Sequence, residues 1–455
     1  MRLLLIYPNV NLEPAVSHGI TSLSGMLKAR GHTVNLLVLK SGKCMKDKIS
    51  CSEARRVKPD VVGFSLTANQ KKYAIEAIRD LKAEFDIPIV VGGVYPTLFP
   101  ELIEQVKEID GLCRGEAEES LVEYLDCLAK GTDYSGIRNW WFRKDDKIIR
   151  NPVRPFNENL NDYPLPDFEI FPRDFFYYPN MAFTRGCPFP CSYCCNHALR
   201  SIYNGQRSYL RFKSVDRAME EIRIFVEKIQ PSWLGFDDDS ITKDKQWLEE
   251  FCLKYPKVSS LPFHCNAFPS TVTPQVCKML KKAGCRLLGI GIESGDEGLR
   301  MKTLKRPIRN HDIIAAFRYA KEAGLLTHSF NMIGIPGETE ESFRKTSELN
   351  RVIQPDFFQL TVFYPYEGTE LGRLAEERAM HSKRDLDTFF CGESVLDMPG
   401  FSRRQIRWQY FWFGYNIYKD TDLKKALGCL KSNIKVYLPR LHRAYMRARY
   451  GCCKA

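Results

Sequence analysis

The sequence predicts an α/β protein with two parallel-sheet domains and a helical C-terminal region. Short apolar runs of strand length alternate with amphipathic helical patterns through most of the chain, which is typical of right-handed crossovers between parallel strands. A proline-rich stretch divides this alternation into two blocks. The length of 455 residues, with 44% hydrophobic and 27% charged residues, suits two or three globular domains and excludes a disordered or fibrous chain.

The first block, residues 1–135, has the pattern of a doubly wound sheet, with strands expected at 3–7, 33–39, 60–65, 87–91 and 110–113 and helices at 20–30, 71–84, 98–106 and 116–129. The helix at 20–30 stops at Gly31, a common terminator. Ligands of such sheets bind at the carboxyl ends of the strands. No Gly-x-Gly-x-x-Gly follows the first strand, so a nicotinamide site has little support. The glycines at these strand ends serve either turns or the close approach of a large ligand.

Residues 136–175 are expected to form a connector, because four prolines at 152, 155, 164 and 166 exclude a long helix. The second block, residues 176–385, contains six β/α units. Its strands are expected at 181–184, 233–236, 263–266, 287–292, 326–333 and 357–363, and its helices at 214–229, 243–255, 274–283, 310–323 and 338–352. Ser214 is the expected N-cap of the first of these helices.

Three cysteines stand close together after the first strand of the second block. Cys187, Cys191 and Cys194 have the spacing Cys-x₃-Cys-x₂-Cys, so their thiolates can surround one centre. Three thiolates suit an iron–sulfur cluster in which one iron lacks a protein ligand, whereas a structural zinc ion normally takes four ligands. His197 could complete such a zinc site, although it lies only three residues after Cys194 on the same loop, so zinc stays as an alternative. The neighbouring Cys195 is interpreted as a thiol that does not bind the metal.

This motif, Thr184-Arg185-Gly186-Cys187-Pro188-Phe189-Pro190-Cys191-Ser192-Tyr193-Cys194, resembles the signature of the radical SAM superfamily. The resemblance implies a partial (β/α)₆ barrel and a 4Fe-4S cluster whose open iron binds S-adenosylmethionine. Cleavage of that molecule generates a 5′-deoxyadenosyl radical at the carboxyl ends of the strands.

Several strand ends of the second block also resemble segments that bind S-adenosylmethionine in this superfamily. The resemblance implies contacts from Tyr193 near the adenine, from Gly235, Phe236 and Asp237 at the methionine amino group, from Glu293 at the ribose, and from Ile333 and Gly334 along the adenine. Two of these residues have structural alternatives. Asp237 belongs to an acidic run that could be a solvated turn, and Glu293 could cap a helix.

Motifs of the first block resemble the cobalamin-binding domain that precedes some radical SAM domains. They are His18-Gly19-Ile20, Lys28-Ala29-Arg30-Gly31-His32, Gly92-Gly93-Val94-Tyr95-Pro96-Thr97 and Arg114-Gly115-Glu116-Ala117-Glu118. The resemblance implies that cobalamin contacts Gly92, Gly93, Thr97 and Glu116. The Asp-x-His-x-x-Gly motif, which supplies a lower-face histidine to cobalt in other cobalamin proteins, is absent.

The basic character of the chain, with a net charge of +12, comes from its C-terminal end. Residues 401–455 hold 13 Lys and Arg, two acids and 11 aromatic residues, while the rest is almost neutral. Nucleic acid is therefore not an expected partner of the protein body. For the region 386–455 we expect a helical cap packed on the barrel. The alternatives are contact with an anionic membrane surface, a cover over a hydrophobic substrate, and single-stranded RNA.

These features together predict a cytoplasmic radical SAM enzyme, with the membrane surface as an alternative location for its tail. The expected reaction is cobalamin-dependent methyl transfer to an unactivated carbon of a small-molecule, lipid or natural-product substrate. Flavodoxin or ferredoxin is the expected electron donor. The alternatives are an oxidative cyclase or rearrangement enzyme, a methylthiotransferase, and a non-catalytic metal-binding or RNA-binding module.

Overall fold

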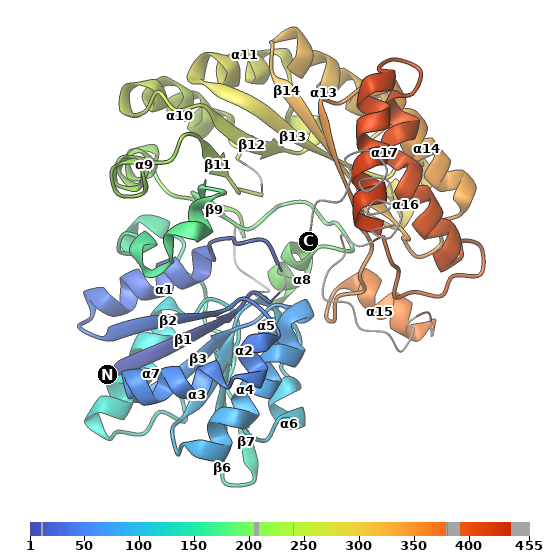
Figure 1. Cartoon of the computed structure of the whole chain (residues 1–455). Helices are drawn as coiled ribbons and strands as arrows, with labels where there is room; N and C mark the ends of the chain where they lie inside the picture. Colours follow the sequence, from blue (N-terminus) through green and yellow to red (C-terminus); the bar gives the residue numbers. More distant parts are fainter. Residues whose placement is uncertain (11, 204–208, 240, 379, 381–391, 438–455) are drawn as a thin grey trace, which may run out of the picture.

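Two mainly parallel sheets, with their carboxyl edges facing each other, organise the chain in a computed structural model (Figure 1). The structure describes residues 1–455 except 11, 204–208, 240, 379, 381–391 and 438–455. The expected α/β class, with a doubly wound N-terminal sheet followed by a partial barrel, is confirmed.

The first sheet has the strand order β2-β1-β3-β4-β5-β6-β7. Its strands are β1 (Arg2–Pro8), β2 (Thr33–Leu39), β3 (Val61–Ser65), β4 (Ile89–Gly92), β5 (Gly111–Cys113), β6 (Trp140–Lys144) and β7 (Lys147–Arg150). The first five are parallel, and β6 and β7 add an antiparallel edge. The alternation of buried side chains on β1 explains the double winding, because Leu3 and Leu5 face one core and Leu4 and Ile6 face another.

Helices cover both faces of this sheet. They are α1 (His18–Ala29), α2 (Lys43–Lys46), α3 (Ile49–Val57), α4 (Lys71–Glu84), α5 (Val94–Leu98), α6 (Leu102–Gln105) and α7 (Glu118–Lys130). The buried residues of α1 and α7 share one core, and those of α3 and α4 share the other. The single helix expected at 98–106 is wrong, because the chain breaks at Phe99 and Pro100 between α5 and α6.

The expected connector contributes structure to the first sheet. Trp140 and Phe142 of β6 are buried and pair with β5, and a two-residue turn at Asp145 and Asp146 leads to β7. Asp145 has φ 53°, a left-handed conformation that aspartate tolerates better than most residues.

The second sheet is an open barrel of six parallel strands in the sequential order β15-β14-β13-β12-β11-β8. They are β8 (Asn180–Met181), β11 (Leu234–Phe236), β12 (Phe263–Ala267), β13 (Cys285–Glu293), β14 (Leu326–Ile333) and β15 (Phe357–Val362). A separate antiparallel pair, β9 (Thr184–Arg185) and β10 (Arg211–Phe212), follows β8.

The helices of this half are α8 (Cys195–Ile202), α9 (Val215–Ile229), α10 (Lys245–Val258), α11 (Pro274–Ala283), α12 (Glu297–Lys302), α13 (Asn310–Glu322), α14 (Glu340–Ile353) and α15 (Glu370–Glu377). Ser214 caps α9, as expected, by accepting a hydrogen bond from the Arg217 amide. The short helix α8, which begins directly after Cys194, was not expected from the sequence.

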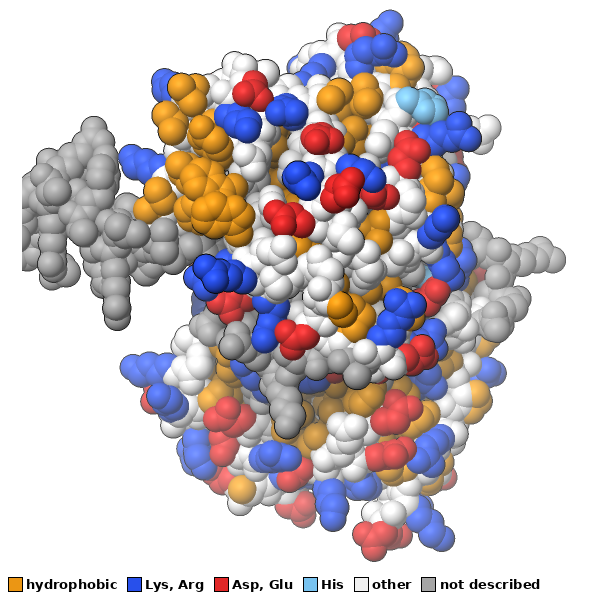
Figure 2. Space-filling model, turned by 90° about the vertical axis from the view of Figure 1, so that its right-hand side faces the viewer, with side chains coloured by type: hydrophobic (Ala, Val, Ile, Leu, Met, Phe, Trp, Pro, Cys, Tyr) orange, Lys and Arg blue, Asp and Glu red, His pale blue; other side chains and the backbone are white. Residues whose placement is uncertain are grey.

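Two C-terminal helices, α16 (Arg403–Tyr418) and α17 (Leu423–Tyr437), lie against the barrel (Figure 1). Phe413 is completely buried, with its ring centroid 5.6 Å from that of Phe343 on α14 and 5.3 Å from that of Phe358 on β15. Trp408 on the same helix is 61% exposed, and Figure 2 shows a patch of hydrophobic side chains on this side of the molecule. The expected helical tail is thus confirmed as far as Tyr437, and the last part of the tail lies outside the described residues.

Replacing Phe413 with alanine should test whether the tail contributes to the core. We expect Phe413→Ala to lower the free energy of unfolding by about 3–5 kcal/mol, because a fully buried aromatic ring leaves a cavity. The exposed Trp408 offers a matched control, and Trp408→Ala should change stability by no more than about 0.5 kcal/mol. Anaerobic urea denaturation of the three proteins measures both values. Equal losses in the two variants would contradict the packing described.

Candidate functional site

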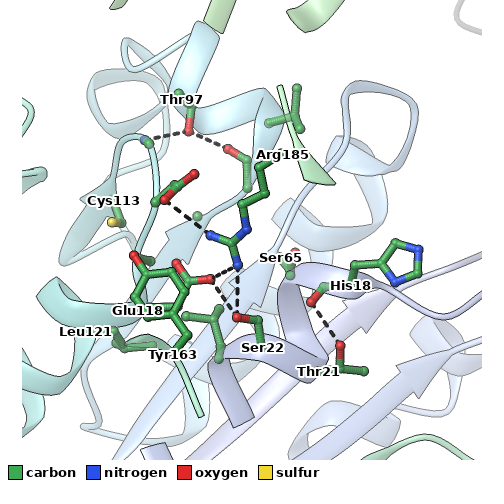
Figure 3. Close-up of a pocket in the computed structure, with 18 of the residues that line it drawn as sticks. His18, Thr21, Ser22, Ser65, Thr97, Cys113, Glu118, Leu121, Tyr163 and Arg185 are labelled. Carbon is green, nitrogen blue, oxygen red and sulfur yellow. Dashed lines mark hydrogen bonds and ion pairs between the residues drawn. The ribbon is translucent and has the colours of Figure 1, made fainter. Parts of the chain in front are cut away.

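A cavity of about 490 Å³ lies between the carboxyl edges of the two sheets (Figure 3). Its lining includes residues at or just after strand ends of both halves, namely Ser65, Gly92, Thr97 and Glu116 from the first domain and Thr184, Asp237 and Asp239 from the barrel half. The cavity continues between the first sheet and helices α1 and α7, where its lining is apolar: Leu5, Val90, Leu121, Trp140 and Phe168. Polar strand ends and an apolar slot therefore line the same space.

The four residues assigned to cobalamin all line this cavity. Gly93 has φ 104°, and a Cβ there would lie 2.8 Å from the Leu66 carbonyl oxygen, so the close approach of the two strand ends requires glycine. Thr97 donates a hydrogen bond from Oγ1 to the Gly93 carbonyl (2.7 Å) and accepts one from the Gly115 amide (3.0 Å). These contacts fix the wall of the cavity at the ends of β4 and β5.

An ion network crosses from the first domain to the strand that precedes the cysteine loop. Arg185 donates to the Ser22 hydroxyl (3.0 Å) and forms ion pairs with Glu118 and with Glu116, the latter at 3.2 Å (Figure 3). Glu116 also pairs with the buried Arg211. The Glu116 carboxylate is therefore held by two guanidinium groups, a contact that the sequence did not reveal.

The buried Glu118 remains ionised because of this network. Burial alone would raise the pKa of Glu118, but Arg185 and the Ser22 hydroxyl hold it below its usual value.

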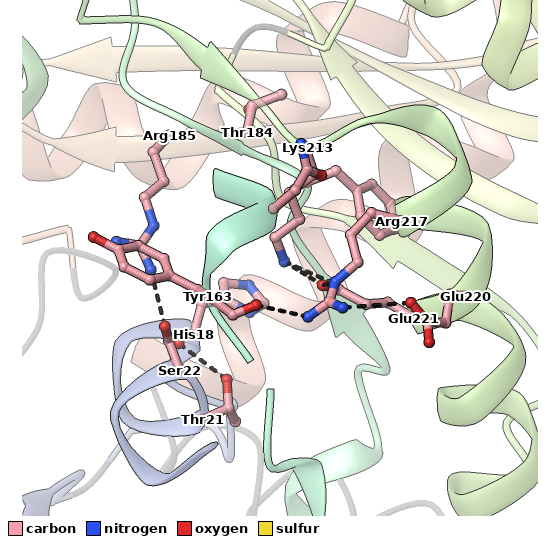
Figure 4. A network of polar contacts seen from close by, with 12 residues as sticks. His18, Thr21, Ser22, Tyr163, Thr184, Arg185, Lys213, Arg217, Glu220 and Glu221 are labelled. Atoms are coloured by element: carbon pink, nitrogen blue, oxygen red, sulfur yellow. Dashed lines mark hydrogen bonds and ion pairs between the residues drawn. The ribbon is translucent and has the colours of Figure 1, made fainter. Parts of the chain in front are cut away.

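A second set of contacts lies along α9, where Arg217 donates to the Tyr163 carbonyl (2.9 Å) and pairs with Glu221, which also binds Lys213 (Figure 4). The two halves of the chain are thus joined by charged groups with defined partners.

The cysteine loop is held at its start and between its second and third cysteines. Gly186 has φ 88°, and a Cβ at this position would collide with the backbone of Tyr209. Ser192 donates from its hydroxyl to the Thr303 carbonyl (2.6 Å) and from its amide to the Leu304 carbonyl (3.2 Å). Cys187, Cys191 and Cys194 are not joined in disulfides.

The donor set of this loop fits an iron–sulfur cluster, although the thiols have not converged. Three thiols lie within eight consecutive residues, and a buried guanidinium, that of Arg306, lies 3.4 Å from the Cys191 sulfur. Within the described part of the chain, no three His, Cys, Asp or Glu side chains are grouped as metal ligands. Thiolates repel one another until a metal compensates their charge, so we expect them to converge when the cluster binds.

Tyr193 and Glu293, both assigned to S-adenosylmethionine, lie together beside Cys191. The Tyr193 hydroxyl hydrogen-bonds with the Glu293 carboxyl group, and burial raises the pKa of Glu293. Glu293 has φ 65°, a strained conformation for this residue type. This pair therefore forms the part of the predicted site that is nearest to the predicted metal ligands.

The other assigned residues are more dispersed. Asp237 faces the first domain, where its Oδ2 lies 3.4 Å from His18 Nε2 and accepts from Asn180 Nδ2 (2.8 Å). Phe236 is buried, with its ring centroid 5.0 Å from that of Phe263, so only its backbone could reach a ligand in the cavity.

The last three residues assigned to S-adenosylmethionine, Gly235, Ile333 and Gly334, lie in or directly after barrel strands. A Cβ at Gly235 would collide with the Asn180 side chain. Ile333 is buried at the end of β14. The Gly334 amide donates to Glu338 (2.6 Å), and burial raises the pKa of Glu338 to about 8.

Asp238, which the sequence did not distinguish from its neighbours, is a buried anchor. It is 1% exposed, and its Oδ1 accepts from the amides of Phe183 (2.8 Å) and Thr184 (2.6 Å) and from the Thr184 hydroxyl (2.7 Å). These bonds tie β11 to β9, directly before the cysteine loop. Burial raises the pKa of Asp238 to about 6, against the effect of the three donors.

The raised pKa of Asp238 predicts a pH dependence of stability. The folded state binds this proton more tightly than the unfolded state. The free energy of unfolding should therefore fall as the pH rises from about 4 to 6 and stay constant at higher pH. For a pKa shift of about two units, the total fall is about 3 kcal/mol. The Asp238→Asn variant should lack this pH-dependent part of the free energy of unfolding. Thermal denaturation between pH 5 and 8 should show the stability of the wild type, relative to the variant, decreasing up to about pH 6.5. The exposed Asp237→Asn is the control, and parallel curves for wild type and Asp238→Asn would contradict the assignment.

Comparisons with known proteins agree with both halves of the site. Residues 181–349 match the family model of the radical SAM superfamily, and residues 14–125 match that of the B12 binding domain. An uncharacterised methyltransferase of Pyrococcus horikoshii is 27% identical over 360 residues, which cover 77% of each chain. The anaerobic magnesium-protoporphyrin IX monomethyl ester cyclase of Rubrivivax gelatinosus is 25% identical over 474 residues, covering 96% of this chain and 82% of the relative.

Solved structures show the same arrangement of domains. The radical S-adenosylmethionine methyltransferase TsrM from Kitasatospora setae, with cobalamin and a [4Fe-4S] cluster bound, has a TM-score of 0.68 at 17% identity, covering 90% of this chain and 81% of that one. The cobalamin-dependent S-adenosylmethionine radical enzyme OxsB has a TM-score of 0.71 at 15% identity, covering 99% and 75%.

The matched domains confirm the predicted cofactors, since a radical SAM domain implies S-adenosylmethionine and a 4Fe-4S cluster and a B12 binding domain implies cobalamin. The individual contacts of the assigned residues remain predictions. The chain belongs to the radical SAM superfamily and carries a B12 binding domain ahead of its radical SAM domain.

Proposed function

We propose that this enzyme transfers a methyl group to an unactivated carbon of a small-molecule, lipid or natural-product substrate, in a reaction that depends on cobalamin. The observation that supports this proposal is the shared cavity, which is bounded by the carboxyl edges of both domains. A substrate held there would lie between the residues assigned to cobalamin and those that precede the cysteine loop.

The residues of the chain divide into three binding sets. Cys187, Cys191 and Cys194 would hold the cluster. Tyr193 and Glu293 would contact S-adenosylmethionine, together with Gly235, Phe236, Asp237, Ile333 and Gly334. Gly92, Gly93, Thr97 and Glu116 would contact cobalamin. When bound, the cluster and S-adenosylmethionine supply a hydrogen-abstracting radical, and cobalamin supplies a transferable methyl group.

The protein's contribution is alignment and exclusion of water. The Arg185 network joins the wall of the cavity to the strand before the cysteine loop, so the two cofactor sites are held in one orientation. The apolar slot lined by Leu5, Val90 and Leu121 offers a dry surface to a flat ligand. A dry site protects a reactive radical from side reactions.

A radical SAM oxidative cyclase without methyl transfer is a second candidate. One observation favours it: the Rubrivivax relative, named as a cyclase, covers 96% of the chain. A methylthiotransferase has less support, because such enzymes need a second set of cluster cysteines. The first-domain cysteines Cys44, Cys51, Cys113 and Cys127 do not have the close spacing in sequence that Cys187, Cys191 and Cys194 have.

The proposal also covers the electron donor of the enzyme and its location in the cell. A one-electron donor such as flavodoxin or ferredoxin would reduce the cluster, and a cytoplasmic location is expected. None of the described helices is both long and apolar enough to cross a bilayer. Contact of residues 401–455 with a membrane surface remains a prediction.

Removal of one predicted cluster ligand should abolish radical formation. After anaerobic reconstitution, the wild type should hold about four irons and release 5′-deoxyadenosine when reduced with dithionite. Cys191→Ala should lose the cluster and this product, whereas Cys195→Ala, which removes the adjacent thiol, should retain both. Iron analysis and chromatography of the nucleoside provide the readouts. Continued 5′-deoxyadenosine formation by Cys191→Ala would refute the assigned ligands.

Isotope transfer should separate the two candidate reactions. The holoenzyme, loaded with cobalamin, would be incubated with methyl-labelled S-adenosylmethionine and an extract of metabolites and lipids. A methyltransferase should place the label in an organic product detected by mass spectrometry, and Cys191→Ala should yield none. Formation of 5′-deoxyadenosine together with an unlabelled, altered product would instead support the cyclase.

A further inference from the structure

We propose that Arg306 is a fixed cation that raises the reduction potential of the cluster bound by Cys187, Cys191 and Cys194. The proposal rests on the proposed function, since it requires a cluster on these cysteines. It assigns to Arg306 a positioning role, with no contact to the substrate.

Arg306 lies between α12 and α13 and is only 6% exposed. Its Nη1 is 3.4 Å from the Cys191 sulfur and 3.4 Å from the Tyr193 hydroxyl, and its Nη2 donates to the Gly291 carbonyl (2.8 Å). The guanidinium also lies over the ring of Phe268, 4.4 Å from its centroid. Contacts on several sides therefore fix the charge next to one predicted ligand of the cluster.

The charge of Arg306 persists in this buried place. A guanidinium is not deprotonated in proteins, and the carboxyl group of Glu293 belongs to the same buried cluster through Tyr193. Its Nε has no partner among the described residues, so the guanidinium is not saturated by the protein. A positive charge beside Cys191 is therefore a permanent feature of the site.

A second buried arginine, Arg300, makes only the contacts expected of a structural residue and so offers a comparison. Arg300 is completely buried, and its guanidinium donates to the carbonyls of Ser294 and Ile308 and to the Asn310 side chain. These contacts hold the segment between β13 and α13. Arg306 instead directs one arm of its fork to a thiol, which is an unusual partner for a structural arginine.

A fixed cation near a cluster ligand favours the reduced form. Reduction adds one electron, taken from a one-electron donor, and so increases the negative charge on the cluster and its thiolates. An adjacent cation in a water-excluded site stabilises that added charge, since the local dielectric screens it poorly. Charge and hydrogen bonds to the sulfur ligands are established ways in which proteins set the potential of such clusters. Removing the charge should therefore make the cluster harder to reduce.

The test is a redox titration of reconstituted protein, followed by the electron paramagnetic resonance signal of the reduced cluster, with dithionite as the reductant. At the midpoint potential of the wild type, Arg306→Gln should lower the ratio of reduced to oxidised cluster about tenfold, which corresponds to a shift of about 59 mV to more negative potential for one electron. Arg306→Lys should shift the potential in the same direction but less, because its ammonium keeps the charge and cannot bridge the same partners.

Lys305 provides the matched control, because it carries the same charge one residue away and pairs with the surface residue Glu370. Lys305→Gln should titrate as the wild type does. An Arg306→Gln protein with full iron content and an unchanged potential would overturn the proposal. If that variant assembles too little cluster, the neutral Arg306→Met is titrated in its place, and an unchanged potential in it overturns the proposal. Failure of the wild type to hold a cluster would refute the proposed function itself, a result that iron analysis distinguishes.

Discussion

The burial of charge at the junction of two sheets is the constraint on which this structure depends. Two carboxyl edges can face one another across a cavity only if the polar groups between them find partners away from water. Arg185 meets this requirement with Glu116, Glu118 and Ser22, and Arg211 adds a second cation to Glu116. A buried ion pair of this kind gives little net stability, but loss of one partner is costly. The network therefore favours one relative orientation of the domains over others, which is what a reaction shared by two cofactors requires.

Local patterns in the sequence predicted most of the fold. The expected ranges for β2 and α4 coincide with the observed ones, since the first is a run rich in β-branched and leucine residues and the second has apolar residues at helical spacing. The missed elements have non-local causes. The β6–β7 hairpin is stabilised by pairing with β5, about 30 residues earlier, and by burial of Trp140 and Phe142. Helix α3 begins and ends beside left-handed Lys48 and Lys58, residues that give no terminator signal in the sequence.

The residues of the candidate site also divide into those that a local motif predicts and those that only the tertiary structure brings together. The cysteine loop and the glycine-rich strand ends were predictable because each is a contiguous motif. Arg306 was not, since it reaches Cys191 across 115 residues of chain. The pairing of Asp237 with His18 spans 219 residues and depends on how the two domains pack, which no periodicity describes. The same argument applies to Glu116, whose sequence context suggested a cofactor contact and whose carboxylate is held by two arginines.

The anchors of the cysteine loop indicate how a metal site can be prepared before the metal arrives. Asp238 fixes β9 through three donors, Gly186 permits the turn that follows, and Ser192 bonds to the segment at Thr303 and Leu304. All of these contacts involve groups other than the cysteine sulfurs. The backbone of the loop is thus held in place by contacts that do not use the sulfurs needed for the metal. A loop with this division of roles keeps its shape when the cluster is lost to oxidation, and can rebuild it without refolding the barrel around it.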